Sequence, residues 1–350
     1  MEPNVLAIVP VYNGRFFAVK AIKSLLSQNY SNLRIVVIDD CSEDDSSSLI
    51  LKEFSDFPQI TILRNERNVG LAQTLNKALE LVTNEEFLLV LEQDCELLNS
   101  DYVSEALKHF QRDDVAVVSG ENLPTNEELS LMKKVFLHHL CEDVHDVGVV
   151  EVGFSLLKAD VFRVEVLRKV GGFESSTRRK LASEEHVVSH KIRSLGYRIL
   201  KDPSLKFRGY WGGQESLLQN LRKEAVYGRG LGWAVARMRT DLKVGESKQL
   251  RSKRRSRMVQ TVYVLLTVFS LFLFFYNPLI ALVLLSAAAL VEFGYLCYRA
   301  LVFRGVKERL FFVVTGFLRG WVYVPNLFFG FLCGLVFGWR GKVASSSKAS

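Results

Sequence analysis

Three carboxylates alternate with other residues in the short stretch 92–96, at Glu92, Asp94 and Glu96. Carboxylates held this close repel one another unless a cation lies among them. Oxygen ligands suit Mg²⁺ or Mn²⁺ better than zinc, which takes mainly nitrogen and sulfur. The spacing therefore predicts a divalent metal site. The alternative is a solvated acidic turn that binds nothing.

The acidic stretch directly follows an apolar run, Phe87–Leu91, whose length and composition predict a buried strand. A parallel strand that ends in acids delivers them to the carboxyl edge of its sheet, where open α/β folds bind ligands. Alternation along an extended chain would put Glu92, Asp94 and Glu96 on one side. The predicted strand 33–38 also ends in acids, Asp39 and Asp40. We expect these groups to meet at one sheet edge.

Predicted strands and helices alternate through the first 240 residues. This order predicts an α/β fold, Rossmann-like, with a mostly parallel sheet flanked by helices. No G-x-G-x-x-G motif follows the first strand, which disfavours a dinucleotide enzyme. Helical spacing is predicted at Arg15–Gln28, Leu71–Val82 and Val161–Val170, and strands at Val5–Val11, Leu33–Ile38, Ile60–Leu63, Phe87–Leu91, Val115–Ser119, Val149–Lys158 and Tyr197–Leu200.

Charge divides the chain into two parts. From Asp241 onward there are 15 basic and 4 acidic residues, whereas the preceding part has a net charge of −4. The first part therefore offers no nucleic-acid-binding face, and basic residues beside apolar segments are typical of a cytoplasmic membrane surface. The N-terminus has neither a basic region nor a long apolar run, so no signal peptide is expected. The five cysteines show no paired spacing, which predicts free thiols.

Two apolar segments of membrane-spanning length follow the basic run that ends at Arg257. No charge occurs between Met258 and Val291, and Asn277-Pro278 divides this stretch. We predict a transmembrane hairpin with its basic flanks inside the cell, hence a multi-pass cell-membrane protein whose α/β domain is cytoplasmic. The predicted parts are 1–240 as the α/β domain with an interfacial region at 217–240, 241–257 as a basic juxtamembrane linker, 258–298 as the hairpin, 299–309 as a cytoplasmic basic loop, 310–339 as a third transmembrane or interfacial segment and 340–350 as a disordered tail.

Five motifs occur in a familiar order. They are Ile8–Asn13 (IVPVYN), Val36–Ser42 (VVIDDCS), Asn68–Ala72 (NVGLA), Glu92-Gln93-Asp94, and Gly171–Glu174 (GGFE) followed by Glu184-Glu185. With these motifs, residues 8–230 resemble a family-2 glycosyltransferase of the GT-A fold. The resemblance extends to polyprenyl-phosphate and dolichyl-phosphate sugar transferases and to related bacterial and archaeal glycan transferases.

The resemblance implies metal-dependent, inverting transfer of a sugar from a UDP- or GDP-sugar donor to a membrane-associated, lipid-linked acceptor. By the same resemblance, Glu185 is the general base and Mg²⁺ or Mn²⁺ is the cofactor. The residues implied by the resemblance are Pro10, Tyr12, Asp40 and Glu92 for the donor, and Asp94, Glu92 and Glu96 for the metal. Position and charge, and not the resemblance, predict a further contact: the interfacial region 217–240 lies between Glu185 and the first apolar segment, so its Arg222 and Arg229 would bind an acceptor phosphate.

The chain departs from the family pattern in several places. Glu92 and Glu185 stand where Asp is usual, Val187 where a further acid is common, and 206–211 lacks the usual His. These departures leave open a sugar-nucleotide-binding membrane protein with impaired catalysis. A polysaccharide synthase is a further alternative, but such enzymes carry Gln-x-x-Arg-Trp, and Lys223 stands where the Trp would be.

Overall fold

The computed structural model describes residues 2–123, 131, 146–174, 184–210, 216–238, 248–301, 303 and 305–338. The chain forms two compact units, one of residues 1–127, 145–213 and 241–247 and one of residues 128–144, 214–240 and 248–350. The predicted tail 340–350 lies outside the described residues. In the described part of the chain, the cysteines at 41, 95, 297 and 333 form no disulfide, and Cys141 lies outside that part.

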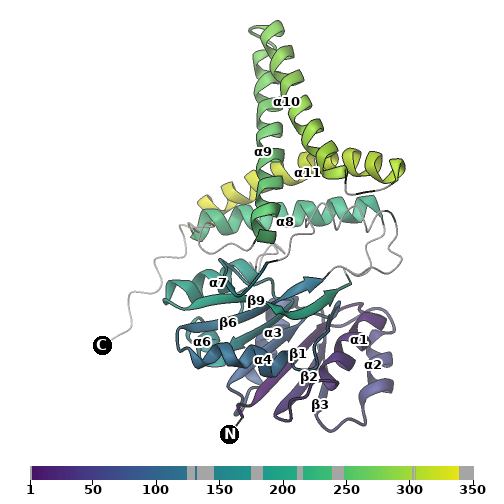
Figure 1. Ribbon diagram of the computed structural model, residues 1–350, viewed down its shortest axis with the longest axis vertical. Helices are drawn as coiled ribbons and strands as arrows, with labels where there is room; N and C mark the ends of the chain where they lie inside the picture. The colour runs from purple at the N-terminus through teal and green to yellow at the C-terminus, as the bar shows by residue number, and fades with distance from the viewer. Residues whose placement is uncertain are drawn as a thin grey trace. The chain divides into compact units, whose positions relative to one another are not determined.

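The first unit is a sheet with helices on both faces (Figure 1). Its described strands are β1 (Val5–Val11), β2 (Leu33–Asp39), β3 (Ile60–Arg64), β4 (Phe87–Leu91), β5 (Cys95–Leu97), β6 (Val115–Leu123), β7 (Val150–Glu151), β8 (Ala159–Arg163) and β9 (Arg198–Gly209). Its described helices are α1 (Arg15–Leu26), α2 (Ser46–Phe54), α3 (Leu71–Glu80), α4 (Tyr102–Lys108), the 3₁₀ turn η1 (His109–Gln111), α6 (Val164–Lys169) and α7 (Glu184–Ser194).

The strands follow the order β3-β2-β1-β4-β8-β6-β9-β5, with β7 beside β9. The predicted α/β sheet with flanking helices is confirmed, and its pairing is mixed. Strands β3, β2, β1 and β4 are parallel, but β8 runs antiparallel to both β4 and β6. In this register Ala159, which begins β8, pairs with Leu91, which ends β4. The residues that precede β8 therefore lie at the carboxyl edge.

Two predicted elements near β8 were wrong in their bounds. The expected strand at 149–158 is reduced to β7, and the expected helix at 161–170 begins only at Val164. Leu157 has φ 56°, which ends an extended chain, and its N–H bonds Ser155 Oγ at 3.2 Å. Val161 and Phe162 are fully buried because β8 lies between two other strands. A short apolar segment can show helical spacing by chance, and here burial between two strands decides that residues 161–163 are extended.

Alternate residues of β1 pack on opposite faces of the sheet. Val5, Ala7 and Val9 join a core formed with α1, α2 and α4, whereas Leu6 and Ile8 are buried on the face that α3 covers. A strand buried on both faces reads as a continuous apolar run, as β1 does. Each buried Val, Leu or Ile side chain contributes about 1.5–3 kcal/mol of burial energy, which anchors the strand ends that form the site.

The second unit consists, in its described part, of α8 (Leu217–Met238), α9 (Lys248–Leu273), α10 (Pro278–Ala300) and α11 (Val306–Gly338). Helices α9 and α10 form a hairpin (Figure 1). Asn277 caps α10 by accepting a hydrogen bond from the Ile280 N–H at 3.1 Å, and Pro278 begins the helix. Because α9 begins at Lys248, the described end of the predicted linker 241–257 is helical.

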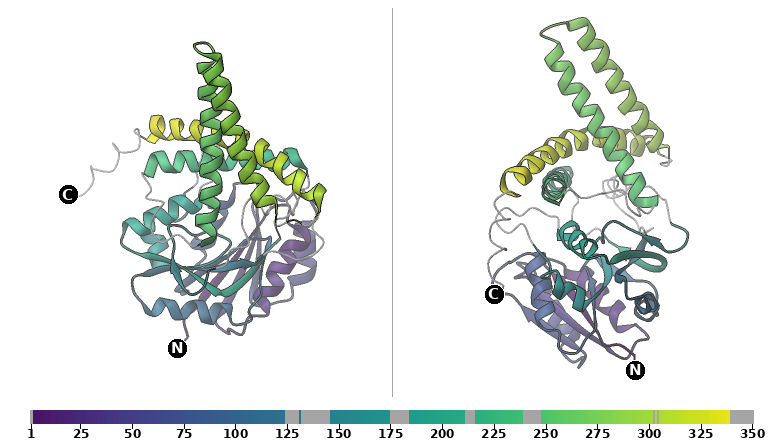
Figure 2. Two further views of the ribbon diagram at one scale, coloured as in Figure 1. Left: turned by 45° about the horizontal axis from the view of Figure 1, so that its top comes forward. Right: turned by 90° about the vertical axis from the view of Figure 1, so that its left-hand side faces the viewer.

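In the described part of the chain, three helical segments are long and apolar enough to cross a membrane, namely Arg255–Leu273, Pro278–Ala300 and Val306–Cys333. The first two are the arms of the hairpin. The third belongs to α11, which lies alongside α8 and crosses the foot of the hairpin (Figures 1 and 2).

Helices α8 and α11 approach each other at glycines. A Cβ placed on Gly232 would lie 1.9 Å from the Leu327 carbonyl oxygen, and one on Gly228 would lie 2.6 Å from that of Tyr323. From the other side, a Cβ on Gly330 would lie 2.0 Å from the Arg229 carbonyl oxygen. We call these three glycines the glycine seam. Small residues spaced four apart are typical of closely packed helix pairs.

A buried ion cluster also joins three helices of this unit, α8, α9 and α11. Glu224 on α8 lies 2.7 Å from an Arg257 nitrogen on α9, and it bonds Arg319 on α11. Burial by itself would raise the pKa of Glu224, but the two arginine charges outweigh it and lower that pKa to about 2. The stabilisation that this carboxylate contributes is thus present above pH 4.5 and lost as the pH falls toward 2. Arg319, which interrupts the apolar sequence of α11, is thereby explained.

The glycine seam predicts a position-specific sensitivity to alanine. Gly232→Ala should lower the free energy of unfolding by about 1–3 kcal/mol, since its Cβ meets backbone that cannot turn aside. Gly294→Ala on α10 is the matched control, because nothing lies within 4 Å of its added Cβ. Alanine there should leave stability unchanged or raise it by up to about 1 kcal/mol. Thermal unfolding in detergent measures both, and equal midpoints for the two variants would contradict the seam.

Candidate active site

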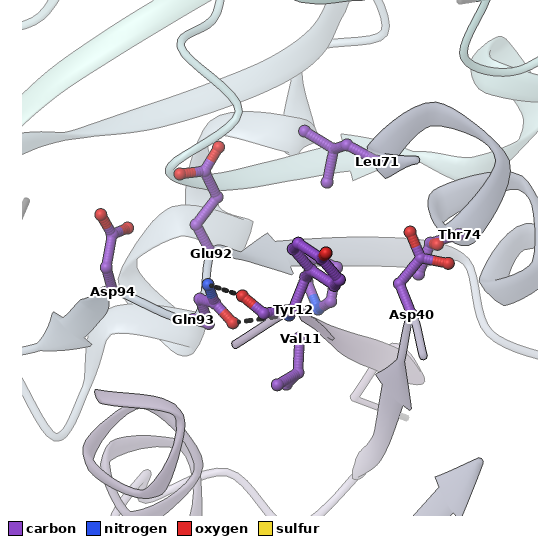
Figure 3. A pocket seen from close by; sticks show the side chains of 9 residues that line it. Val11, Tyr12, Asp40, Leu71, Thr74, Glu92, Gln93 and Asp94 are labelled. Carbon is purple, nitrogen blue, oxygen red and sulfur yellow. Dashed lines mark hydrogen bonds between the residues drawn. The ribbon is translucent and has the colours of Figure 1, made fainter. Parts of the chain in front are cut away.

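A pocket of about 170 Å³ lies where β1, β2 and β4 end (Figure 3). It brings together five of the residues predicted for the site, namely Pro10, Tyr12, Asp40, Glu92 and Asp94. Val11, Leu71, Thr74 and Gln93 complete its lining. The pocket is therefore at the carboxyl edge of the parallel strands, where the sequence pattern predicted it.

The acidic stretch after β4 forms a turn and not an extended strand. The Cys95 N–H donates to the Glu92 carbonyl at 2.9 Å, and the Tyr210 N–H donates to the Asp94 carbonyl at 2.7 Å. The turn leaves Glu92 and Asp94 on the pocket wall. Glu96 continues into β5, where it bonds the Tyr210 hydroxyl and lies 3.6 Å from Arg208. The structure does not bring Glu96 to the pocket, so the expected alignment of three acids reduces to two.

A lysine that no sequence motif indicated lies between these two acids. The Lys158 ammonium bonds Glu92 and lies 3.4 Å from an Asp94 oxygen. All three side chains are about one-fifth exposed. In the described part of the chain, no group of three or more His, Cys, Asp or Glu side chains is arranged to hold a metal ion. The pair nevertheless fits a cation, because both carboxylates already face one ammonium.

Gln93, between the two acids, holds the first turn of the chain. Its side-chain oxygen accepts the Tyr12 N–H at 2.8 Å, and its amide donates to the Tyr12 carbonyl at 2.9 Å (Figure 3). A Cβ on Gly14 would lie 2.2 Å from that Gln93 oxygen, so a larger residue there would require the Gln93 amide to shift. The middle residue of the Glu-Gln-Asp motif is thus a positioning residue for Tyr12. Sequence reasoning missed it because the partner is 81 positions away.

The two acids that end β2 have different surroundings. Asp39 is buried, bonds the Ser42 N–H and lies 2.5 Å from Arg64. Asp40 faces the pocket and accepts three hydrogen bonds at 2.8–2.9 Å, from the Asn65 amide and the N–H groups of Val69 and Gly70. A carboxylate offers about four acceptor positions. One position on Asp40 therefore remains for a ligand, next to the N-terminus of α3, where negative charge is favoured.

The predicted base, Glu185, lies in the first turn of α7. It does not line the pocket, and its carboxylate is 3.8 Å from the His186 ring. Helix α7 is fastened to the segment that leads to Lys158. The Ser155 N–H donates to Ser189 Oγ at 3.1 Å, and the rings of Phe154 and His186 are 4.4 Å apart. The helix of Glu185 and the acids of the pocket are thus joined through one short segment.

Strained backbone gathers beside the pocket. Asn13, Cys41 and Leu157 have φ of 52°, 62° and 56°, a region that Asn tolerates but that costs Cys41 and Leu157 about 1–2 kcal/mol each. Each adjoins a residue already described, namely Tyr12, Asp40 or Lys158. Strain of this kind persists where surrounding contacts enforce it, and it is concentrated at functional sites.

The remaining predicted residues, Arg222 and Arg229, lie on α8 in the second unit. Arg222 is exposed. Arg229 is partly buried, and its guanidinium donates to the Asn326 side chain on α11.

Comparison with known proteins identifies the family of the chain. The model of glycosyl transferase family 2 matches residues 6–185. An O-antigen chain rhamnosyltransferase of Salmonella anatum is 27% identical over 206 residues, covering 56% of this chain and 63% of that protein. A Campylobacter jejuni GalNAc(5)-diNAcBac-PP-undecaprenol β-1,3-glucosyltransferase is 34% identical over 98 residues, covering 28% and 31%. The chain thus spans less than two thirds of the length of these curated relatives.

A solved structure supports the fold over nearly the whole chain. A mannosyltransferase from Pyrobaculum calidifontis, in complex with GDP-Man and Mn²⁺, superposes with a TM-score of 0.57 at 17% identity. The alignment covers 96% of this chain and 88% of that one. The family model covers more than half of the sequence, so the chain belongs to glycosyltransferase family 2, with the GT-A fold.

Proposed function

We propose that this protein transfers a sugar from a UDP- or GDP-sugar to a lipid-linked acceptor, with inversion, at the cytoplasmic face of the cell membrane. The observation that carries the proposal is the arrangement of the pocket. Tyr12 lies between Asp40 on one side and Glu92 and Asp94 on the other (Figure 3). One side suits a nucleobase and the other a diphosphate. The names of the similar proteins agree, since one was solved with GDP-Man and another is named for an undecaprenol-linked substrate.

The nucleoside would occupy the side of the pocket near Asp40. The remaining acceptor position on that carboxylate suits a base N–H, and the Tyr12 ring offers a flat surface for stacking. The volume of about 170 Å³ is small for a complete ligand pocket, which usually has roughly 300–1,000 Å³. The described walls thus fit part of the donor.

The diphosphate would lie beside Glu92 and Asp94. These residues would hold Mg²⁺ or Mn²⁺, which neutralises the charge that develops on the leaving nucleoside diphosphate. Asp94 is the principal ligand in this proposal and Glu92 the second. Glu96 would act only from outside the pocket, given its contacts with Tyr210 and Arg208.

Glu185 would act as the base. A hydroxyl acceptor needs a carboxylate to take its proton as the bond to the sugar forms, whereas a phosphate acceptor already carries charge and needs the base less. The contacts between α7 and the 154–158 segment support this role, since they tie the helix of Glu185 to the acids that face the diphosphate.

A membrane-bound acceptor accords with the second unit. Its hairpin exposes large apolar side chains such as Phe269, Phe272, Leu282 and Val291. The basic flanks favour a cytoplasmic catalytic domain. Because Arg229 is bonded to Asn326, the exposed Arg222 is the better candidate for an acceptor phosphate. Helix α11 lies alongside α8 and across the hairpin, which favours an interfacial position over a third span.

Loss of the Asp94 or the Glu185 carboxylate should lower turnover, and the protein should still fold. Asp94→Asn should lower kcat/KM by at least about 100-fold, the scale of removing one key electrostatic stabiliser. Glu185→Gln should lower kcat while donor binding is retained.

A panel of nucleotide sugars, screened by thermal shift with Mn²⁺, identifies the donor, and product analysis with a lipid phosphate and a lipid-linked glycan identifies the acceptor. Donor binding without transfer by the wild type would support the impaired binder, and addition of many sugars a polysaccharide synthase.

Asp40 should affect the nucleoside part of the donor. Asp40→Ala should weaken binding of the nucleoside and of the nucleoside diphosphate alike, by about tenfold, since a hydrogen bond to a charged group contributes about 1.5–3 kcal/mol. Asn65→Ala is the matched control, because it removes a support of the same turn and leaves the carboxylate. Its effect should be smaller. Calorimetry with both ligands tests this. A loss of affinity for the nucleoside diphosphate alone would show that Asp40 does not contact the nucleobase.

Single cysteines in a background without the native ones would test the topology. Asn277→Cys should react with an impermeant reagent from outside, and Lys307→Cys should react only after the cells are opened. A third cysteine, Ser347→Cys, reports on α11. If α11 is interfacial, Ser347→Cys should behave like Lys307→Cys. Labelling of Ser347→Cys from outside would make α11 a third span, and outside labelling of Lys307→Cys would reverse the proposed orientation.

A further inference from the structure

Lys158 is joined to the acids of the pocket through both its backbone and its side chain. The Glu92 N–H donates to the Lys158 carbonyl at 2.9 Å, which continues the pairing of Leu91 with Ala159. The ammonium bonds the Glu92 carboxylate and lies 3.4 Å from that of Asp94. The antiparallel register of β8 thus brings a positive charge to the two acids that would hold a metal.

The backbone of Lys158 is held firmly, whereas its side chain is long. Leu157, before it, has φ 56° and is 2% exposed. Ser155 Oγ accepts the Leu157 N–H and donates to the buried Asp160, which fixes the turn. The lysine stem has four flexible carbons, so its charge is able to move while its backbone stays in place.

A metal ion and this ammonium compete for the same oxygens. A divalent cation between Glu92 and Asp94 would lie within a few ångströms of the ammonium, and like charges at that separation repel strongly in a partly buried site. The metal therefore needs the ammonium to move. A donor diphosphate supplies both oxygen ligands for the metal and a negative charge for the displaced lysine.

We propose that Lys158 is a resident cation of the Glu92–Asp94 pair, which a divalent metal displaces, so that firm metal binding depends on the donor diphosphate. The inference rests on the proposed function, because it takes these acids as the metal site. It makes Lys158 a positioning residue that orders binding: diphosphate and metal enter together, and the ammonium then turns to the diphosphate.

The test measures Mn²⁺ binding by the full-length protein in detergent, from the paramagnetic resonance signal of free Mn²⁺. Without nucleotide, wild type should bind Mn²⁺ weakly, and UDP or GDP should strengthen binding within the 5- to 150-fold range usual for coupled ligands. Lys158→Met should bind Mn²⁺ alone at least about tenfold more tightly than wild type, so that added nucleotide strengthens it less.

Two further variants control for charge and for folding. Lys158→Arg keeps the positive charge and should bind Mn²⁺ alone as weakly as wild type. Lys169→Met removes a lysine that also pairs with an acid, Glu165 at 3.9 Å on α6, but does not line the pocket. It should leave Mn²⁺ affinity unchanged. Thermal unfolding without metal verifies that each variant is folded. If Lys158→Met does not fold, the comparison of Lys158→Arg with wild type serves as the test.

The outcomes separate this inference from the proposed function. Equal Mn²⁺ affinity in wild type and Lys158→Met, or tighter binding by Lys158→Arg than by wild type, would overturn the inference. Absence of Mn²⁺ binding in every variant, with or without nucleotide, would overturn it as well. The proposed function would still stand in each case if a nucleotide sugar stabilises the protein and its sugar is transferred. Failure of donor binding itself would instead overturn the proposed function.

Discussion

The candidate site depends on the placement of one antiparallel strand. If β8 were parallel to β4, the residues that precede it would lie at the opposite edge of the sheet. Because it is antiparallel, its first residue pairs with the last of β4, and Lys158 meets Glu92. Two carboxylates at a sheet edge need a positive charge nearby, and this register provides one from the chain itself. The segment that supplies it also holds the helix of Glu185 through Ser155 and Ser189.

The pocket is built by contacts that are individually modest and that act on the backbone. Gln93 grips both backbone groups of Tyr12, and Asp40 holds the turn before α3 with three hydrogen bonds. Each such bond contributes only about 0.5–1.5 kcal/mol, or more where a charge is involved. Together they maintain Asn13 and Cys41 in the left-handed backbone region, which is costly for Cys41. Burial of the apolar strands behind them contributes the free energy that offsets this backbone strain.

In the second unit, the same requirement for paired charges appears in apolar surroundings. Glu224 is ionised because Arg257 and Arg319 face it, and the arginines are tolerated among apolar residues because Glu224 faces them. Removing one partner from such a cluster usually costs about 3–5 kcal/mol, because the remaining charge stays buried. With the glycine seam, the cluster specifies which faces of α8, α9 and α11 meet. Apolar packing alone would leave that choice nearly degenerate.

Local sequence was sufficient for the fold class, for the carboxyl-edge position of Tyr12, Asp40, Glu92 and Asp94, and for the hairpin break at Asn277-Pro278. These features follow from apolar runs, from the acids that end them and from turn residues, all of which act over a few positions. Pairing between distant strands was decided only by the tertiary structure. The register of β8 brings Lys158 to the acids of the pocket, and the turn at 92–95 keeps Glu96 away from the pocket. Gln93 bonds Tyr12, which lies 81 residues away in the sequence. Such contacts depend on which strand lies beside which, and no local pattern of residues encodes that choice.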